Sequence, residues 1–391
     1  MKHVDEMADF ATLERVDWTR PIFSRSQVDH AGEILITTPA DSNAASEAIR
    51  VVSNWRFSHG YPLQSISMAL LDLAKWKSQQ SLTAQRIKRI PSIYLKLRNT
   101  PAMKLSRMHD IGGCRAIMPS VGLTEKLVEE YEKSARHNPH RFGEFVKRYD
   151  YIQSPKPDGY RGVHIVCKYR SNSEAGEDYE GLRIEIQLRS QLQHTWATAV
   201  ETVSTFTGEA LRSNIGSVAW KRFFALASTA ICKIEKRPTV PGTPTDMAEL
   251  QRELQGCFEQ VTALEKLTQA VDLIGSKPGH FFLLKLNARK RTIQTETFQQ
   301  NQVLQAQERY LELEKEIKNK PEIQVVLVGA DSVSELRKVY PNYFLDVTEF
   351  AKTIKMVMAL WPQPFPDVIR ELTKIDPYWW RLNSSIPPSS D

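Results

Sequence analysis

Two segments of the chain each carry one carboxylate among cationic and apolar residues. In MHDIGGCRAIM, Asp110 precedes two glycines and Arg115 opens an apolar run. In LRIEIQLR, strand alternation places Glu185 and Gln187 on the face opposite the leucines and isoleucines. The ordinary interpretations are a tight turn and a solvated strand face. The functional interpretation is that Asp110 and Glu185 together hold Mg²⁺, which takes one or two carboxylates plus phosphate oxygens.

A third segment, QRIKRIPSIYLKLRN, gathers cations. They are Arg86, Lys88, Arg89, Lys96 and Arg98. A solvated basic helix face would explain such a run. However, Pro91 interrupts it and Ser92 follows, which suits Ser92 as a helix cap. Cations beside a helix N-terminus form an anion site, so this segment can also bind phosphate.

The fourth segment is the loop KPDGYRGVH. Lys156 can neutralise phosphate, and Gly159 permits close approach of the backbone. Tyr160 offers a flat face for a base, and His164 enters a strand. Alone, this segment could be an ordinary turn. Four such segments within about a hundred residues predict a polyphosphate site with metal carboxylates and an aromatic platform.

Together the four segments resemble the RelA/SpoT nucleotide pyrophosphokinase domain, in order and spacing, over roughly residues 45–235. RxKxxxSIxxK matches Arg86, Lys88, Ser92, Ile93 and Lys96, and DIxGxR matches Asp110, Ile111, Gly113 and Arg115. DYI…PKxxGYxxxH matches Asp150, Tyr151, Ile152, Pro155, Lys156, Gly159, Tyr160 and His164, and EIQxR matches Glu185, Ile186, Gln187 and Arg189. The resemblance implies transfer of the β,γ-pyrophosphate of ATP to a ribose hydroxyl, with release of AMP.

The resemblance also implies a role for each matching residue. ATP would contact Arg86, Lys88, Ser92, Lys96 and Arg115, with adenine held between the two guanidiniums. Catalysis would fall to Glu185, Asp110 and Gln187, with Mg²⁺ on the two carboxylates and Glu185 as the proton acceptor. The acceptor nucleotide would contact Lys156, Tyr160, Arg161 and His164.

The acceptor loop departs from the family. Many alarmone synthetases carry NGYQSLH where this chain has DGYRGVH, so Arg161 and Gly162 replace Gln and Ser. No HD-type hydrolase motif precedes the domain. A catalytically inactive sensor or binding module is a further alternative, and the intact Asp110 and Glu185 argue against it.

The region beyond residue 240 resembles the C-terminal part of CapRel, a fused toxin–antitoxin among toxic small alarmone synthetases. The motif is YPNY, with Tyr340 and Tyr343. This resemblance implies an autoinhibited toxin that modifies the 3′ end of tRNA in phage defence, released by a phage protein that binds the C-terminal domain. The alternative function is a stand-alone synthetase that uses GTP or GDP as acceptor. The two tyrosines could equally be core aromatics.

The elements that position these residues predict an α+β fold. We expect a nucleotidyltransferase-like mixed sheet flanked by helices, a long connecting helix and a small α+β C-terminal domain. Expected helices cover 44–56, 82–99, 191–206, 247–274, 301–318 and 346–360, and expected strands cover 114–118, 162–170, 182–189, 280–287, 291–298 and 323–329. The expected divisions are an N-terminal extension (1–44), the catalytic domain (45–235), a linker and connecting helix (236–275), the regulatory domain (276–361) and a tail (362–391).

Composition sets the remaining limits. The chain has 391 residues with 52 Lys and Arg against 46 Asp and Glu, a mild basic excess that permits a phosphate-rich partner. None of its four cysteines forms a CxxC pair, which argues against zinc and for reduced thiols. The longest apolar stretch, residues 223–231, is too short for a membrane span. We therefore expect a cytoplasmic protein without membrane contact.

Overall fold

The computed structural model describes residues 16–39, 42–207, 218–257, 259–260, 272–274, 279–287, 290, 292–317, 320, 323–329 and 347–360. Within these ranges nine strands form one mixed sheet, in the order β3-β4-β5-β2-β1-β9-β7-β8-β6. The strands are β1 (Leu82–Ile87), β2 (Gly112–Met118), β3 (Glu144–Asp150), β4 (Val163–Lys168), β5 (Arg183–Ser190), β6 (Asp272–Ile274), β7 (Phe281–Asn287), β8 (Thr292–Phe298) and β9 (Ile323–Gly329). The β2–β5 and β6–β8 pairs are parallel and the others antiparallel. The predicted α+β class with a mixed sheet is confirmed.

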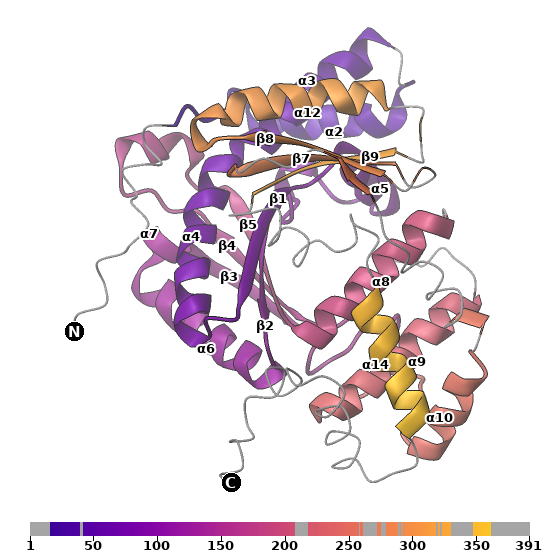
Figure 1. Ribbon diagram of the computed structural model, residues 1–391. Helices are drawn as coiled ribbons and strands as arrows, with labels where there is room; N and C mark the ends of the chain where they lie inside the picture. Colours follow the sequence, from indigo (N-terminus) through magenta and orange to yellow (C-terminus); the bar gives the residue numbers. More distant parts are fainter. Residues whose placement is uncertain are drawn as a thin grey trace.

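Helices flank the sheet on both faces (Figure 1). They are α2 (Arg25–Thr37), α3 (Asn43–Ser58), α4 (Gly60–Lys77), α5 (Ile90–Asn99), α6 (Val121–His137), α7 (Pro139–Phe142), α8 (Gln191–Thr207), α9 (Val218–Glu235), α10 (Met247–Gln255), α12 (Val303–Glu316) and α14 (Thr348–Leu360). Across the described ranges, none of these helices has the length and apolar character needed to cross a bilayer.

The alternation of β5 decides which face of the sheet is core and which carries polar groups. Ile184, Ile186 and Leu188 are fully buried in a cluster with α4 and α6. Because successive strand residues point to opposite faces, Glu185 and Gln187 project from the other side, where α8 lies. The predicted division of this segment into an apolar and a polar face is confirmed.

The expected helix over 82–99 is wrong in its first half. Residues Leu82–Ile87 form β1, which pairs antiparallel with β2 over six residues, and only Ile90–Asn99 is helical. Arg89 is the N-cap of α5 and Pro91 lies in its first turn, so Ser92 is not the cap. Proline is well suited to this position because the first helical N–H groups have no intrahelical partner. The strand gains cross-strand pairing, which local periodicity does not reveal.

The expected single helix over 247–274 is wrong where the structure describes it; residue 258 and residues 261–271 lie outside the described residues. Helix α10 ends at Gln255, and Asp272–Ile274 forms β6, which pairs in parallel with β8. The apolar residues Leu250 and Leu254 do line one buried face, as their spacing predicts. The error arises because an open sheet edge can recruit a short apolar segment that would otherwise extend a helical pattern.

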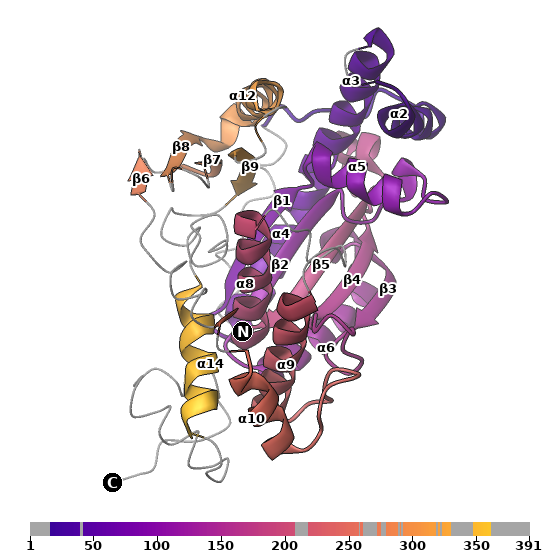
Figure 2. The ribbon, with the colours of Figure 1, turned by 90° about the vertical axis from the view of Figure 1, so that its right-hand side faces the viewer.

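The elements expected after residue 279 are confirmed, and they extend the catalytic sheet. Strands β7 and β8 form the expected hairpin, and β9 joins the sheet by pairing Gln85 with Gly329 and Arg86 with Val328. Figure 2 shows α12 along one side of β7–β9, and α14 beside α8, α9 and α10. The domain boundaries themselves stay predictions. Tyr340, Tyr343 and the tail 362–391 lie outside the described residues.

Candidate active site

The strand register brings the predicted chemistry onto one row of the sheet. Arg86 on β1 pairs with Gly113 on β2, which in turn pairs with Glu185 on β5. A Cβ atom at Gly113 would meet only the Glu185 carbonyl oxygen, at 3.7 Å. Because position 113 has no side chain, nothing from β2 fills the space between Arg86 on β1 and Glu185 on β5 in this row. In the next row, Gln187 pairs with Arg115 on one side and His164 on the other.

Asp110 lies two residues before β2 and contacts two cations. Its two carboxylate oxygens accept hydrogen bonds from Lys88 Nζ at 2.6 Å and Lys96 Nζ at 2.8 Å. Burial by itself would raise the pKa of Asp110, but the ammonium groups of Lys88 and Lys96 hold it below its usual range. Burial lowers the pKa of Lys88, although Asp110 opposes this. The cluster presents an ionised carboxylate between two ammonium groups.

Glu185 belongs to a closed ring of hydrogen bonds. His164 Nδ1 donates to Glu185 Oε1 at 3.1 Å, and Gln187 Nε2 donates to Glu185 Oε2 at 2.8 Å. Arg189 donates to Gln187 Oε1 and to the Tyr160 hydroxyl, both at 2.8 Å. A hydrogen bond between the Tyr160 hydroxyl and His164 Nε2 completes the ring. Each member therefore fixes the orientation of the next.

The ring perturbs the protonation of its members. Burial would raise the pKa of Glu185, but His164 and Gln187 hold it far below its usual range. Burial would lower the pKa of His164, but Tyr160 and Glu185 raise it to about 9. Burial would likewise raise the pKa of Tyr160, but Arg189 and His164 lower it to about 8. At neutral pH the ring thus contains a carboxylate, an imidazolium and a readily ionised phenol.

These residues face a cavity of about 510 Å³. It is lined by Arg86, Lys88, Lys96, Met103, Arg107, His109, Asp110, Tyr149, Tyr151, Lys156, Asp158, Tyr160, His164, Glu185, Gln187, Arg189, Trp196, Val200, Lys221 and Phe224. Seven of these side chains are lysine or arginine and three are aspartate or glutamate. Such an excess of cations favours a polyanionic ligand.

A smaller adjoining cavity contains Arg115, a predicted nucleotide contact that does not line the larger one. It is lined by Arg86, Lys88, Asp110, Gly113, Cys114, Arg115, Glu185 and Gln187. The predicted pair Arg86 and Arg115 therefore shares one cavity with both carboxylates. Among the described residues no group of three or more His, Cys, Asp or Glu side chains is arranged for a metal ion. Asp110 and Glu185 are a two-carboxylate set, and magnesium completes such a set with phosphate oxygens.

Two predicted site residues lie elsewhere. Ser92 lines neither cavity. Arg161 is only 2% exposed and forms an ion pair with Glu235 of α9. It also donates to Cys232 Sγ at 3.0 Å and to the Ser228 carbonyl oxygen at 3.4 Å. The prediction that Arg161 contacts the acceptor is corrected: its charge is used inside the protein, where it anchors the loop to α9.

The acceptor loop depends on glycine for its course. Gly159 has φ of +93°, and a Cβ atom there would lie 2.8 Å from the Trp196 ring and 3.0 Å from the Phe224 carbonyl oxygen. The turn therefore packs tightly against α8 and α9. It directs the Lys156 ammonium over the rings of Tyr151 and Tyr160, at 4.4 and 5.1 Å from their centroids.

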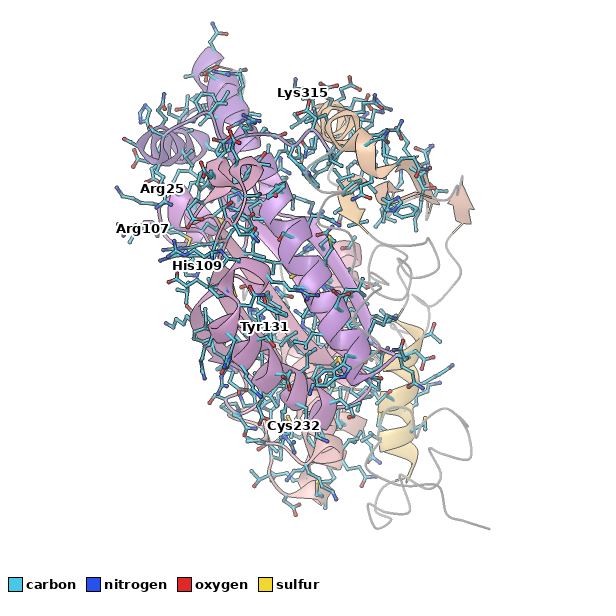
Figure 3. All side chains as sticks on the ribbon, turned by 90° about the vertical axis from the view of Figure 1, so that its left-hand side faces the viewer. Arg25, Arg107, His109, Tyr131, Cys232 and Lys315 are labelled. Atoms are coloured by element: carbon cyan, nitrogen blue, oxygen red, sulfur yellow. The ribbon has the colours of Figure 1, made fainter. Side chains whose placement is uncertain are left out.

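Several residues at the site were not predicted from the sequence. Tyr149 and Tyr151 stack with their rings 9° from parallel, and Trp196 packs edge-on against Tyr160. The spacing of Tyr149, at the end of β3, and Tyr151, directly after it, was a usable signal, because residues two apart along an extended chain share a face. Arg107 and His109, labelled near one another in Figure 3, also line the larger cavity. The sequence around Arg107 and His109 gave no sign that their side chains would line the cavity.

Comparison with known proteins identifies the domain. Residues 85–206 match the family described as "Region found in RelA / SpoT proteins". The chain contains a RelA/SpoT-type domain. This stretch begins within β1 and ends in the last turn of α8, and it contains both carboxylates and most of the cations described above.

Relatives of this RelA/SpoT-type domain include two proteins of Bacillus subtilis. GTP pyrophosphokinase YwaC is 32% identical over 122 residues, which cover 30% of this chain and 54% of that protein. GTP pyrophosphokinase YjbM is 30% identical over 115 residues, 29% of this chain and 51% of that protein. The uncharacterized protein Rv1366 of Mycobacterium tuberculosis is 24% identical over 197 residues, 50% of this chain and 63% of that protein. The chain thus spans between about half and two thirds of these relatives.

Two solved structures from Bacillus subtilis also resemble the chain. Small alarmone synthetase 2 shares 21% identity at a TM-score of 0.38, covering 47% of this chain and 93% of that one. Small alarmone synthetase 1 bound to its product pppGpp shares 21% identity at a TM-score of 0.38, covering 50% of this chain and 94% of that one. The likeness of the whole chain to CapRel stays a prediction.

Proposed function

We propose that the protein is a pyrophosphokinase that transfers the β,γ-pyrophosphate of ATP to a ribose hydroxyl of an acceptor nucleotide and releases AMP. The observation that carries the proposal is that Asp110 and Glu185, both held ionised, line cavities in which lysine and arginine outnumber aspartate and glutamate. The match of residues 85–206 and the names of the curated relatives support it.

The cations account for the triphosphate. Lys88 and Lys96 neutralise phosphate charge once the nucleotide replaces Asp110 as their partner, and Lys156 contributes from the acceptor loop. Arg86 and Arg115 line the small cavity together, and because its volume is only about 30 Å³, stacking of adenine between the two guanidiniums requires this cavity to widen on binding. When Lys88 and Lys96 turn from Asp110 to the phosphates, the two carboxylate oxygens of Asp110 become free to bind a metal ion.

The residues fit a magnesium ion. Asp110 and Glu185 line the same small cavity, and both are ionised. When bound between these carboxylates and the phosphate oxygens, Mg²⁺ would offset the negative charge that develops during transfer.

The transfer itself forms one bond and breaks another. The ribose oxygen attacks the β-phosphorus, the bond from that phosphorus to the α,β-bridging oxygen breaks, and AMP leaves. The Glu185 carboxylate accepts the proton from the attacking hydroxyl, and His164 and Gln187 hold this carboxylate in place. Arg189 and His164 together fix the Tyr160 hydroxyl, and with it the orientation of the ring that we propose stacks on the acceptor base.

The test follows labelled phosphate. The full-length protein carrying Tyr340→Ala and Tyr343→Ala, which removes the inhibition proposed below, is incubated with γ-labelled ATP, magnesium and a mixture of GTP, GDP and bulk tRNA. We expect label to appear in one acceptor with an equal amount of AMP released, and no transfer by Glu185→Gln. ADP release, or hydrolysis to labelled inorganic phosphate without labelled acceptor, would refute the proposal.

For the acceptor, we propose the 3′ end of tRNA, with a guanine nucleotide as the alternative. The altered DGYRGVH loop and the CapRel-like layout favour tRNA. The names of the Bacillus subtilis relatives favour GTP. Lys147 and Arg148 on β3 are exposed, Lys147 over the Tyr149 ring and Arg148 in a surface ion pair with Glu132, and we propose that both contact RNA phosphates. Reversing both charges should reduce tRNA labelling and its salt dependence while GTP labelling, if present, stays unchanged.

We further propose that the setting is phage defence, with the C-terminal region inhibiting the enzyme until a phage protein binds it. The YPNY motif supports the inhibitory part. A double change of Tyr340→Ala and Tyr343→Ala should make the protein growth-inhibitory, and adding Glu185→Gln should abolish the toxicity. A double variant that is well expressed and harmless would rule out this inhibition.

A further inference from the structure

Arg56 is a buried charge outside both cavities. The side chain lies on α3, has no solvent exposure, and packs its guanidinium over the rings of Phe57 and Tyr310, each centroid at 5.3 Å. A guanidinium in such surroundings costs free energy unless hydrogen bonds and an opposite charge compensate it. The contacts of the Arg56 guanidinium therefore indicate the role of this buried charge.

One contact is with the backbone of the candidate active site. Arg56 Nε donates to the carbonyl oxygen of Lys88 at 2.8 Å. The amide nitrogen of Lys88 donates to the Ile111 carbonyl oxygen at 2.8 Å, and Lys88 Nζ donates to Asp110 Oδ2 at 2.6 Å. Lys88 is thus held at three atoms, and two of the three bonds lead to the segment that carries Asp110.

The other contact reaches the far part of the chain. Arg56 NH1 donates to Glu314 Oε2 at 3.1 Å, across 258 residues of sequence. Glu314 lies on α12, the helix that ends near Lys315 at the top of Figure 3. A second link runs beside it, since Arg89 NH1 donates to Gln324 Oε1 of β9 at 3.1 Å. Strand β9 itself pairs with Arg86 on β1.

We propose that α12 belongs to the nucleotide site as a positioning element: Glu314 fixes Arg56, and Arg56 fixes the backbone of Lys88 so that its ammonium meets the phosphates. This inference deepens the proposed function and rests on it for the identity of the ligand. Arg56 and Glu314 touch no reacting atom, so they are positioning residues rather than catalytic ones.

A purely structural ion pair would behave differently when replaced as a unit. Exchanging both partners of a buried pair for apolar residues of similar size is often neutral for stability, whereas removing one partner leaves an uncompensated charge. In Arg56→Met with Glu314→Leu, the fold should therefore be retained while the hydrogen bond to the Lys88 carbonyl is lost. Stability and nucleotide binding are separated in this double variant.

The experiment uses the full-length wild type, each single variant, the double variant and Arg56→Lys. Arg56→Lys keeps a cation for Glu314 but cannot place an N–H where Nε lies. Glu312→Gln is the matched control, because Glu312 is 62% exposed on the same helix and pairs only with Arg309 among the contacts described. Calorimetry gives the Kd for ATP, hydrogen exchange of the segment 86–96 reports the Lys88 amide, and urea unfolding reports stability.

We expect Arg56→Lys and the double variant to unfold like the wild type yet bind ATP about tenfold more weakly, because a hydrogen bond from a charged donor is worth at least that factor. Exchange at the Lys88 amide should be faster in both, and Glu312→Gln should match the wild type throughout. Wild-type Kd and exchange in either variant would overturn the inference. Failure of the wild type to bind ATP would instead contradict the proposed function, and the exchange data would still decide the role of α12.

Discussion

Asp110 and Glu185 differ in their partners although both are partly buried carboxylates with a lowered pKa. Asp110 is paired with ammonium groups that a nucleotide can take over, whereas Glu185 is held by an imidazolium and an amide that remain in place. The first is therefore suited to exchange its partners when ligands bind, and the second to keep a fixed orientation during proton transfer.

Neutral replacements of these carboxylates should abolish transfer without unfolding the protein. Asp110→Asn and Glu185→Gln remove charge stabilisation of the transition state, which typically costs a factor of 10² or more in kcat. Steady-state AMP release measures the effect, and circular dichroism confirms the fold. Near wild-type turnover in either variant would show that the carboxylate has been assigned the wrong role.

NMR of the protein with labelled histidine should show His164 titrating with a pKa near 9. Because this pKa is raised above the unfolded value of about 6.5, the interaction contributes its full stability below about pH 6.5 and loses it as pH rises through about 9. In Glu185→Gln the pKa should move down toward the ordinary value. An unchanged titration in that variant would mean that Glu185 does not hold the imidazolium.

At the scale of elements, the acceptor loop and α9 form a unit through Arg161 and Glu235. Ser190 Oγ and Gln193 Nε2 also donate to Glu235, so the end of β5 and the start of α8 join the same cluster. Both members of the ion pair are almost fully buried. The acceptor loop is therefore anchored to α9 by the Arg161 guanidinium, which lines neither cavity.

Arg161→Ala should lower the free energy of unfolding by about 3–5 kcal/mol, because Glu235 would remain buried without its partner. Chemical denaturation measures the loss. Arg148→Ala is the control: its side chain is 42% exposed in a surface ion pair, so its change should stay within about 1 kcal/mol. A small effect of Arg161→Ala would return that side chain to the list of acceptor contacts.

The sequence predicted elements where the pattern is local and missed them where distant pairing decides. The alternation around Glu185 gave strand, face and burial together, since period 2 states all three. Strand β1 was missed because its pairing with β2 and β9 has no local signature. Arg161 was misplaced for a similar reason: its counter-ion lies 74 residues away, and a solvated and a buried arginine look the same in sequence.

At the scale of the whole molecule, the described elements beyond residue 279 pack against both the catalytic sheet and α9. Strand β9 lies against β1, and Phe350 of α14 packs on Phe223 and Phe224, the latter a wall of the larger cavity. The candidate active site and the described C-terminal elements therefore belong to one packed structure.

Thermal unfolding should accordingly show one cooperative transition. Far-ultraviolet circular dichroism and tryptophan fluorescence should give the same midpoint, and calorimetry a single peak. Phe350→Ala should lower that midpoint as a whole, because truncating a fully buried phenylalanine costs about 3–5 kcal/mol. Two separate transitions would show that the C-terminal elements fold independently of the catalytic sheet.

The distance in sequence between Arg56 and Glu314 has a consequence for biosynthesis. Ribosomes add about 5–20 residues per second, so the 258 residues between the two partners take about 13–52 s to synthesise. Once Glu185 has been synthesised, the nascent chain contains both carboxylates and every predicted cation, but it still lacks the helix that neutralises Arg56 and the strand that pairs with β1. A growing chain on the ribosome should therefore be unable to bind its nucleotide tightly, and activity should begin only after α12 and β9 have emerged.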